Sequence, residues 1–322
     1  MKKIAIAGGS GYMGKLLIHY LMGRGHQLIV LSRKDFENQK NLEFVKWDGR
    51  THGAWHAALE DADVLINLCG QSVNCRYNEK NKQAIYQSRL KSTQLLGEAL
   101  ERLDCGPELW MNASSATIYR SSKVEMDEEA QHGEGFSVEV CEQWESRFYK
   151  YKKTGARQIA LRMAMVFDTA AGGPYDHMKE AVQLGFGKGI GDGNQYVSWI
   201  HGHDLCRAID FMLMHKELEG NINISSPQPI PNADFMKIIA DSQKPLFRMR
   251  CPNWLLSLGV IVKQTEKELV LKSRRVVPKR LLDAGFHFHY ADFVDAEKEL
   301  SSRTKSATNS ENVYCNIDRW ER

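Results

Sequence analysis

The sequence lacks an excess of charge of either sign, and it lacks any long apolar run. Its 322 residues include 43 lysines and arginines against 40 aspartates and glutamates, a formal net charge of +3. So small an imbalance, with no basic stripe interleaved with aromatic residues, argues against a nucleic-acid partner. No apolar run approaches the roughly 20 residues that a membrane-spanning helix needs. We therefore expect no nucleic acid and no membrane as partners.

The chain also lacks paired cysteines. Its seven cysteines are odd in number and scattered, with no C-x-x-C pair, at Cys69, Cys75, Cys105, Cys141, Cys206, Cys251 and Cys315. This pattern fits free thiols in a reducing compartment better than disulfides or a zinc site. Because the first residues already read as a core strand, we expect no signal peptide. The sequence thus predicts a cytoplasmic protein without a metal.

A glycine-rich turn lies between a short apolar strand at the N-terminus and an amphipathic helix. Gly8 permits the turn, Gly11 lets the backbone approach a pyrophosphate, and Gly14 lets helix and strand pack closely. The phosphates would then lie on the free N–H groups of the helix N-terminus. The spacing and its context predict a dinucleotide-binding site, which also includes Tyr12 and Met13.

The end of the second strand, residues 27–31, indicates which dinucleotide. Ser32, Arg33 and Lys34 stand where an NAD-binding site would carry an acidic residue for the ribose 2′-hydroxyl, and Asp35 comes slightly too late. Arg33 and Lys34 would pair with a 2′-phosphate, and Ser32 would hydrogen-bond it. These residues predict NADP(H), with two basic residues on a solvated loop as the alternative.

Apolar runs then alternate with a helical stretch. Further strands are expected at 42–47, 62–68, 109–114 and 158–163, with a helix over 79–102. This alternation is typical of α/β proteins with a doubly wound parallel (Rossmann) sheet, which bind ligands beyond the carboxyl ends of the strands. Asp48, directly after the third strand, is therefore counted among the cofactor residues.

From residue 172 the alternation of apolar runs with helical stretches no longer holds. A glycine-dense segment, 185–194, reads as a loop that approaches a ligand or covers the site, and helices are expected at 232–242, 253–262 and 264–273. We expect a nucleotide-binding domain over 1–226, of which 172–200 contributes to the substrate cleft. A smaller, mainly helical C-terminal substrate lobe over 227–300 and a flexible tail over 301–322 would follow.

Several segments carry the motifs of a known superfamily. They are Gly8-x-x-Gly11-x-x-Gly14, Asn67-Leu68-Cys69-Gly70 and Ser114-Ser115-Ala116-Thr117-Ile118-Tyr119. With them the chain resembles the extended short-chain dehydrogenase/reductases, which include nucleotide-sugar epimerases. The resemblance implies that Asn67, Cys69 and Gly70 lie at the cofactor.

Within that superfamily the chain most resembles an atypical epimerase-like branch with a C-terminal domain of unassigned role. The segments that carry this likeness are Tyr86-Gln87-Ser88-Arg89, Gly191-Asp192-Gly193-Asn194-Gln195, Ser198-Trp199-Ile200-His201, and Val276-Val277-Pro278-Lys279-Arg280-Leu281 followed by Ala284-Gly285-Phe286. Gln195, at the end of one motif, is counted as a substrate-binding residue.

The superfamily's hydride chemistry uses a Tyr-x-x-x-Lys pair on one helix face. Tyr149 and Lys153 match this spacing, but they stand too close to the strand at 158–163. Alignment from the flanking strands places Ser137 and Cys141 at the catalytic positions instead. The usual pair is therefore expected to be absent.

Proton transfer must then use another group, or there is little catalysis. Ser115 is the best-placed candidate, because the superfamily's serine hydrogen-bonds the reacting oxygen, and Thr117 and Tyr119 follow on the same strand end. Tyr119 is read either as a substitute acid or as a packed aromatic residue. Cys141, with no histidine near it in sequence, is expected to be buried and inert.

Two arginines are expected on the substrate side. Arg76 lies in the loop after the fourth strand and Arg89 on the following helix. Together they would suit a carboxylate or a phosphate, or each would pair with a local acid such as Glu79 or Glu145.

His201 and Asp204 invite a metal or catalytic interpretation. The resemblance implies instead that they fix the backbone and that Asp204 caps a helix.

Two functions remain open. One is an NADP(H)-binding oxidoreductase or epimerase-like enzyme acting on a small substrate that is anionic or nucleotide-linked. The alternative is a non-catalytic NADP(H)-binding sensor or regulatory protein. The expected partner is a small-molecule substrate, with a homodimer left open.

Overall fold

A parallel sheet forms the centre of the computed structural model, which describes residues 1–170, 173–252 and 271–309. Seven strands pair in the order β11-β7-β5-β4-β1-β2-β3, and every pairing is parallel. They are β1 (Lys3–Ala7), β2 (Gln27–Ser32), β3 (Leu42–Lys46), β4 (Val64–Asn67), β5 (Leu109–Ser115), β7 (Arg157–Met163) and β11 (Gly220–Ile224). The chain builds outward from β1 on one side and from β4 on the other, so the doubly wound fold is confirmed.

The order of the strands places the site. Neighbouring strands β1 and β4 lead in opposite directions across the sheet, and this switch point is where ligands bind in such folds. Ile4, Ile6 and Ile66 are completely buried, as expected for central strands that are covered on both faces. The turns that follow β1, β2, β3, β4 and β5 therefore lie along one edge of the sheet.

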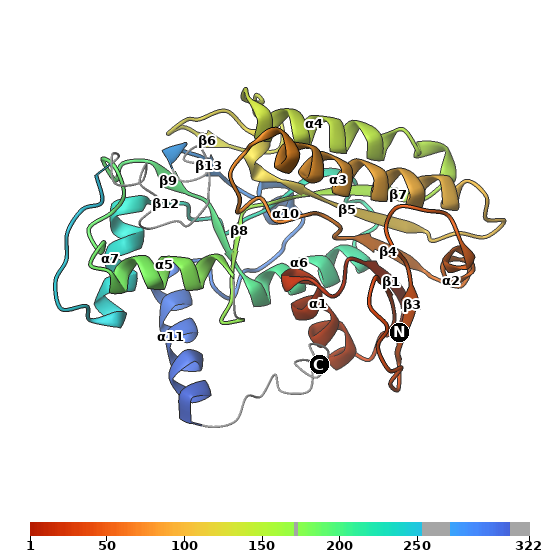
Figure 1. Cartoon of the computed structure of the whole chain (residues 1–322), viewed down its shortest axis with the longest axis horizontal. Helices are drawn as coiled ribbons and strands as arrows, with labels where there is room; N and C mark the ends of the chain where they lie inside the picture. The colour runs from red at the N-terminus through yellow and green to blue at the C-terminus, as the bar shows by residue number, and fades with distance from the viewer. Residues whose placement is uncertain (171–172, 253–270, 310–322) are drawn as a thin grey trace.

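Helices cover both faces (Figure 1). They are α1 (Tyr12–Gly23), α2 (Ala57–Glu60), α3 (Glu79–Leu100), α4 (Phe136–Tyr149), α5 (Pro174–Gln183), α6 (Gly202–Met214), α7 (Asn232–Gln243), α10 (Lys279–Asp283) and α11 (Phe293–Asn309), with 3₁₀ turns η1 (Ala54–His56), η2 (Ala116–Ile118) and η3 (Lys152–Thr154). Helices α1 and α6 pack on one face, whereas α3 and α4 lie on the other.

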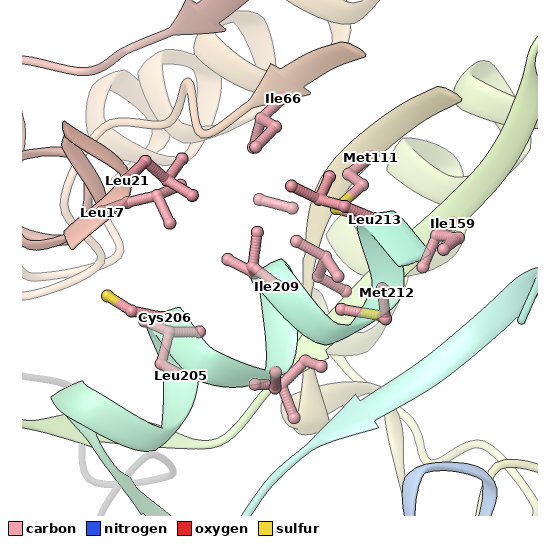
Figure 2. Packing of buried hydrophobic residues seen from close by; sticks show 14 of the residues in the cluster. Leu17, Leu21, Ile66, Met111, Ile159, Leu205, Cys206, Ile209, Met212 and Leu213 are labelled. Carbon is pink, nitrogen blue, oxygen red and sulfur yellow. The ribbon is translucent and has the colours of Figure 1, made fainter. Parts of the chain in front are cut away.

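The layer under α1 and α6 is built from aliphatic side chains. Figure 2 shows Leu17 and Leu21 of α1 and Ile209 and Leu213 of α6 gathered against the strand residues Ile66, Met111 and Ile159. Each of these seven side chains is at least 94% buried. This packing holds α1 rigidly, with its N-terminus at the edge of the sheet where the strands end.

The C-terminal part packs beside the sheet. A separate apolar cluster joins residues of α5, α7 and α11 and includes Tyr175, Phe235, Met236, Phe293 and Leu300. Two short ladders contribute residues to it: β8 (Met165–Phe167) with β10 (Trp199–His201), and β9 (Tyr196–Val197) with β12 (Ile230–Pro231). A third ladder, β6 (Glu125–Met126) with β13 (Arg275–Val276), belongs to another buried cluster.

Several expectations for this part can be compared with the structure. Helix α7 matches the helix expected at 232–242, whereas 253–262 and most of 264–273 lie outside the described residues. Leu281 and Phe286 of the expected anchor segment are buried in the main core. The seventh strand, β11, was not expected from the sequence. The domain boundary after residue 226 stays a prediction.

Residues 301–309, where the sequence predicts the start of a flexible tail, continue α11. Ser301 is buried and donates to a carboxylate oxygen of Glu297 at 2.6 Å. Arg303 donates to Asp168 at 2.9 Å. The segment is polar, and within it Ser301 and Arg303 bond residues outside α11, Ser242 and Asp168. Residues 310–322 lie outside the described part.

No described helix combines the length and the apolarity that would be needed to cross a lipid bilayer. The six cysteines that the structure describes are all free thiols.

Candidate functional site

The glycine turn after β1 is formed as the sequence predicts. Gly8 has a φ of +78°, and a Cβ there would lie 2.9 Å from the backbone nitrogen of Cys69. A Cβ at Gly14 would lie 2.4 Å from the carbonyl oxygen of Gly9. Gly11 is the N-cap of α1, and neither a side-chain cap nor an acidic residue occupies the first turn. This helix N-terminus therefore offers uncompensated N–H groups to an anion, which fits the pyrophosphate of a dinucleotide.

The two residues at the start of α1 face inward. The Tyr12 ring packs directly against Gly173, where an added Cβ would lie only 2.6 Å from the ring. The Tyr12 hydroxyl donates to the carbonyl oxygen of Val166 at 3.4 Å. Burial, reinforced by the Asp168 carboxylate, raises the pKa of Tyr12. Met13 packs against the main core. Both side chains are half-buried and shape the turn, and their contact with a cofactor stays a prediction.

Basic side chains lie where β2 ends. Ser32 is buried and accepts a hydrogen bond from the backbone of Lys34 at 3.1 Å. Arg33 and Lys34 are exposed. Asp35 is exposed and pairs with Lys46 at 2.6 Å.

An open hollow of about 730 Å³ adjoins these residues. It is lined by Arg33, Val45, Lys46, Trp47, Asp48, Arg50, Thr51, His52, Gly53, Ala54 and Trp55. The Asp48 carboxylate accepts from the backbone of Arg50 at 2.8 Å and of Thr51 at 2.9 Å, and these bonds lower its pKa. Asp48 thus fixes the loop that forms the wall of the hollow.

The end of β4 is shaped by Asn67. Its amide nitrogen donates to Asn112 at 2.7 Å and to Thr93 at 3.1 Å, and its oxygen accepts from the backbone of Cys69 at 3.1 Å. Fully buried, Asn67 positions the loop rather than contacting a ligand. Burial raises the pKa of the Cys69 thiol to about 12, although the positive charge of Arg33 acts to lower it. A Cβ on Gly70 would meet the guanidinium carbon of Arg89 at 3.2 Å.

Two of the three catalytic candidates lie together. Ser115 ends β5, and its Oγ accepts hydrogen bonds from the Thr117 backbone at 3.2 Å and from the Thr117 hydroxyl at 3.0 Å. The Thr117 hydroxyl lies 3.5 Å from the Cys141 sulfur. Burial raises the pKa of Cys141 to about 11, so it is a thiol at neutral pH, as expected.

Tyr119 lies apart from this group. Its ring is completely buried, and its hydroxyl donates to Asn223 at 2.7 Å and accepts from Arg162 at 3.0 Å. Burial raises the pKa of Tyr119 to about 12. Of the two readings of Tyr119, the structure favours the packed aromatic residue.

The register of α4 agrees with the alignment from the flanking strands. Cys141 contacts Thr117, and Ser137 stands one turn earlier on the same helix. Tyr149 lies at the other end of α4, about 12 Å farther along the axis. Its hydroxyl donates to Asn221 at 2.8 Å. The formal Tyr-x-x-x-Lys match is therefore away from Ser115.

The two expected substrate arginines differ. Arg76 is exposed, and Arg89 donates through Nη1 to the carbonyl oxygens of Gln71 at 3.1 Å and Ile85 at 3.2 Å. Within the described residues neither arginine forms an ion pair. The two acids that were their alternative partners are engaged elsewhere, Glu79 with Lys82 and Glu145 with Arg162.

Gln195 is used inside the glycine-dense loop, where its amide donates to the carbonyl oxygen of Ile190 at 3.0 Å. The loop packs closely on α7, since a Cβ on Gly193 would lie 2.8 Å from the Cβ of Ala233. The Ile190 amide donates to the Asn232 side chain at 2.7 Å. These contacts indicate that the glycines serve tight packing, rather than a loop free to adapt.

His201 and Asp204 have structural roles, as expected, but the residue that caps the N-terminus of α6 is His201 and not Asp204. The His201 ring accepts from the backbone of His203 at 3.1 Å. Asp204 accepts from the backbone of His289 at 3.0 Å, and it pairs with Arg207 at 2.8 Å. Ligand atoms of His203, Asp204 and His289 lie within 4.8 Å of one another, but the Asp204 oxygens are already occupied by these donors.

Sequence reasoning missed a buried ion pair next to Ser115. Arg162 in β7 donates to both carboxylate oxygens of Glu145 at 2.9 and 2.8 Å. Glu145 also accepts from Ser114 at 2.6 Å. An arginine in the middle of an apolar strand was the available signal, because such a charge requires a buried partner.

Comparison with known proteins gives the family. The model of the NAD dependent epimerase/dehydratase family matches residues 4–225. The chain belongs to this family. A second family model, that of a domain of unknown function (DUF1731), matches residues 251–300.

Relatives within the epimerase/dehydratase family cover nearly the whole chain. An epimerase family protein of Mycobacterium bovis is 30% identical over 289 residues, 89% of this chain and 93% of its own length. Epimerase family protein YfhF of Bacillus subtilis is 30% identical over 308 residues, 94% of this chain and 99% of its own. The structure of the human epimerase family protein SDR39U1 (isoform 2) with NADPH superposes with a TM-score of 0.82 at 25% identity, covering 93% of this chain and 99% of that one.

Family membership implies a nicotinamide dinucleotide, and the residues fit it. Gly8, Gly11 and Gly14 leave the space and the N–H groups for a pyrophosphate. Arg33 borders the hollow at the end of β2, where the adenosine end would be held, and Ser115 lies at the end of the central strand β5. The chain is thus an epimerase-like protein with a nicotinamide-dinucleotide site.

Proposed function

We propose that the chain is an NADP(H)-dependent, epimerase-like oxidoreductase of the cytoplasm. The observation that carries the choice of cofactor is Arg33, which is exposed at the end of β2 and borders the 730 Å³ hollow. Lys34 stands beside it, and the next residue, Asp35, pairs with Lys46. A guanidinium at this position attracts a 2′-phosphate, whereas the acidic residue of an NAD site would repel it. The NADPH in the human relative supports this choice.

The protein's own residues would hold the reacting substrate oxygen. When bound, NADP(H) supplies the hydride chemistry. The Ser115 hydroxyl accepts from Thr117, so its own proton is available to a substrate carbonyl or hydroxyl oxygen. Hydrogen bonding to that oxygen is most valuable when charge develops on it during reaction.

Two arginines after β4 favour a small anionic substrate. Arg76 in the loop after β4 is exposed, and Arg89 adds a second positive charge with no carboxylate paired to it in the described part of the chain. Such charges recognise a carboxylate or a phosphate. The absence of a Tyr-Lys pair on α4 keeps a second function in view, an NADP(H) sensor without turnover.

The cofactor assignment is tested by titrating NADPH and NADH against the wild type and Arg33→Ala. Losing one charge-assisted bond at an exposed site costs about 1.5 kcal/mol, so NADPH affinity should fall roughly tenfold while NADH affinity stays unchanged. Arg24→Ala is the matched control, because Arg24 is also exposed but lies just beyond the other end of α1, paired with Asp210. Equal affinities of the wild type for both cofactors would contradict the proposal.

A further inference from the structure

A second arginine lines the hollow that Arg33 borders. Arg50 belongs to the loop after β3, is exposed, and lines the same hollow of about 730 Å³. The two arginines follow neighbouring strands. Strands β2 and β3 pair as far as Ser32 and Lys46, and the backbone of Trp47 then donates to the carbonyl oxygen of Ser32 at 2.8 Å. Arg33 therefore leaves β2 beside the point where the loop of Arg50 leaves β3.

The loop that carries Arg50 is held in place by its own bonds. Asp48 accepts hydrogen bonds from the backbone of Arg50 and from the hydroxyl of Thr51, both at 2.8 Å. The buried Trp55 donates through Nε1 to the carbonyl oxygen of Thr51 at 3.1 Å, and its ring packs on that of Trp47 with 5.0 Å between the centroids. These contacts fix the backbone of the loop and do not use the Arg50 side chain, so the guanidinium extends from an ordered turn.

The charges around the hollow favour an anion. In the described part of the chain, its lining includes three lysines and arginines, of which Lys46 already pairs with Asp35 at 2.6 Å. No ion pair or side-chain hydrogen bond within the described residues engages the guanidinium of Arg33 or of Arg50. Asp48 also lines the hollow, but its carboxylate oxygens accept from donors of its own loop. Two unpaired guanidinium groups therefore border one space.

We propose that Arg50 binds the same 2′-phosphate as Arg33, and that it is a second residue selecting NADP(H) over NAD(H). The inference rests on the proposed function, which assigns the 2′-phosphate to Arg33. A phosphate monoester carries about −1.5 to −2 elementary charges at pH 7, more than one guanidinium neutralises. Each arginine presents paired N–H donors that match phosphate oxygens, so two arginines satisfy both the charge and the acceptors of this group. The selectivity site then belongs to β2 and β3 together.

Two nucleotides isolate the contribution of the 2′-phosphate: adenosine 2′,5′-bisphosphate and adenosine 5′-phosphate. Isothermal titration calorimetry with the full chain measures the affinity for each. Because one charge-assisted bond is lost, Arg50→Ala should bind the bisphosphate roughly tenfold more weakly and the 5′-phosphate within about twofold of wild type. The substitution retains the backbone bond to Asp48, so the loop should stay formed. The double variant Arg33→Ala with Arg50→Ala should prefer the bisphosphate by less than about fivefold, which is what an exposed ion pair with Lys34 contributes.

Lys46→Gln is the matched control, because Lys46 lines the same hollow but is engaged by Asp35. Its affinity for the bisphosphate should stay within about fivefold of wild type, since exposed pairs of this kind contribute little. A tenfold loss in this control would overturn the inference, because the general charge of the hollow would then explain the effect of Arg50.

The remaining outcomes separate the inference from the proposed function. Bisphosphate binding that is unchanged in Arg50→Ala but weakened in Arg33→Ala would overturn the inference and leave the proposed function intact. An equal loss of affinity for both nucleotides in Arg50→Ala would also overturn it, since Arg50 would then contact the part that the nucleotides share. A wild type that binds both nucleotides equally tightly would instead contradict the proposed function.

Discussion

Replacing Arg162 by methionine should destabilise the protein strongly, because it leaves a carboxylate buried without its cation. The Arg162 side chain is 3% exposed and that of Glu145 is 8% exposed. Two hydrogen bonds, at 2.9 and 2.8 Å, join them. In Arg162→Met, the Glu145 carboxylate would keep only the hydroxyl of Ser114 among these donors. Methionine fills much of the volume, so the main loss is electrostatic.

The size of the effect follows from this burial. Breaking a buried ion pair by removing one partner costs about 3–5 kcal/mol. The unfolding entropy of a chain of 322 residues is roughly 0.7 kcal/mol per kelvin near 60 °C. The variant should therefore melt roughly 4–7 °C below the wild type.

Thermal unfolding followed by circular dichroism at one fixed scan rate measures this shift. Arg24→Met is the control, since the Arg24–Asp210 pair is largely exposed on the arginine side and such pairs contribute about 0–1 kcal/mol. The double variant Arg162→Met with Glu145→Gln should recover part of the loss, because no charge is then left unpaired. If Arg162→Met and the Arg24→Met control had the same melting temperature, the reasoning would be refuted.

Two further predictions concern the site. Tyr149→Phe, alone or with Lys153→Met, should leave cofactor affinity and turnover within a few-fold of wild type, since the Tyr149 hydroxyl bonds Asn221; a 100-fold loss of kcat would show that α4 is misplaced. Amides of the glycine-dense loop should exchange slowly even without ligand, because Ile190 donates to Asn232 and Gly191 to the Cys251 carbonyl; hydrogen-exchange mass spectrometry would contradict this by showing rapid exchange that slows only with NADPH and a substrate.

The sheet could be predicted from the sequence because its strands are continuous apolar runs. Six strands and the helix over 79–100 follow from periodicity and glycine positions alone. The seventh strand, β11, was missed because Asn221 and Asn223 interrupt its apolar residues. In the folded protein the side chains of these asparagines accept hydrogen bonds from Tyr149 and Tyr119. Both tyrosines are distant in sequence, so the sequence does not show that these polar side chains are satisfied inside the fold.

The glycine turn of the proposed cofactor site could be predicted for a similar reason. Its residues follow consecutive strands, and the turn chemistry of Gly8 and Gly14 is local. The catalytic half depends on side chains from separate segments. The sequence contains no sign that Arg89 lies on Trp144. Likewise, the sequence does not show that Arg303 reaches Asp168, 135 residues away, in the segment that its polarity made resemble a tail.

The central claim is that this chain binds NADP(H) with its 2′-phosphate at Arg33 and its reactive ring at Ser115. Determination of the structure with NADPH bound tests it most directly. The account predicts the 2′-phosphate within hydrogen-bond distance of Arg33 and the nicotinamide ring beside Ser115. A 2′-phosphate turned to solvent, away from Arg33, or a nicotinamide ring remote from Ser115 would contradict it.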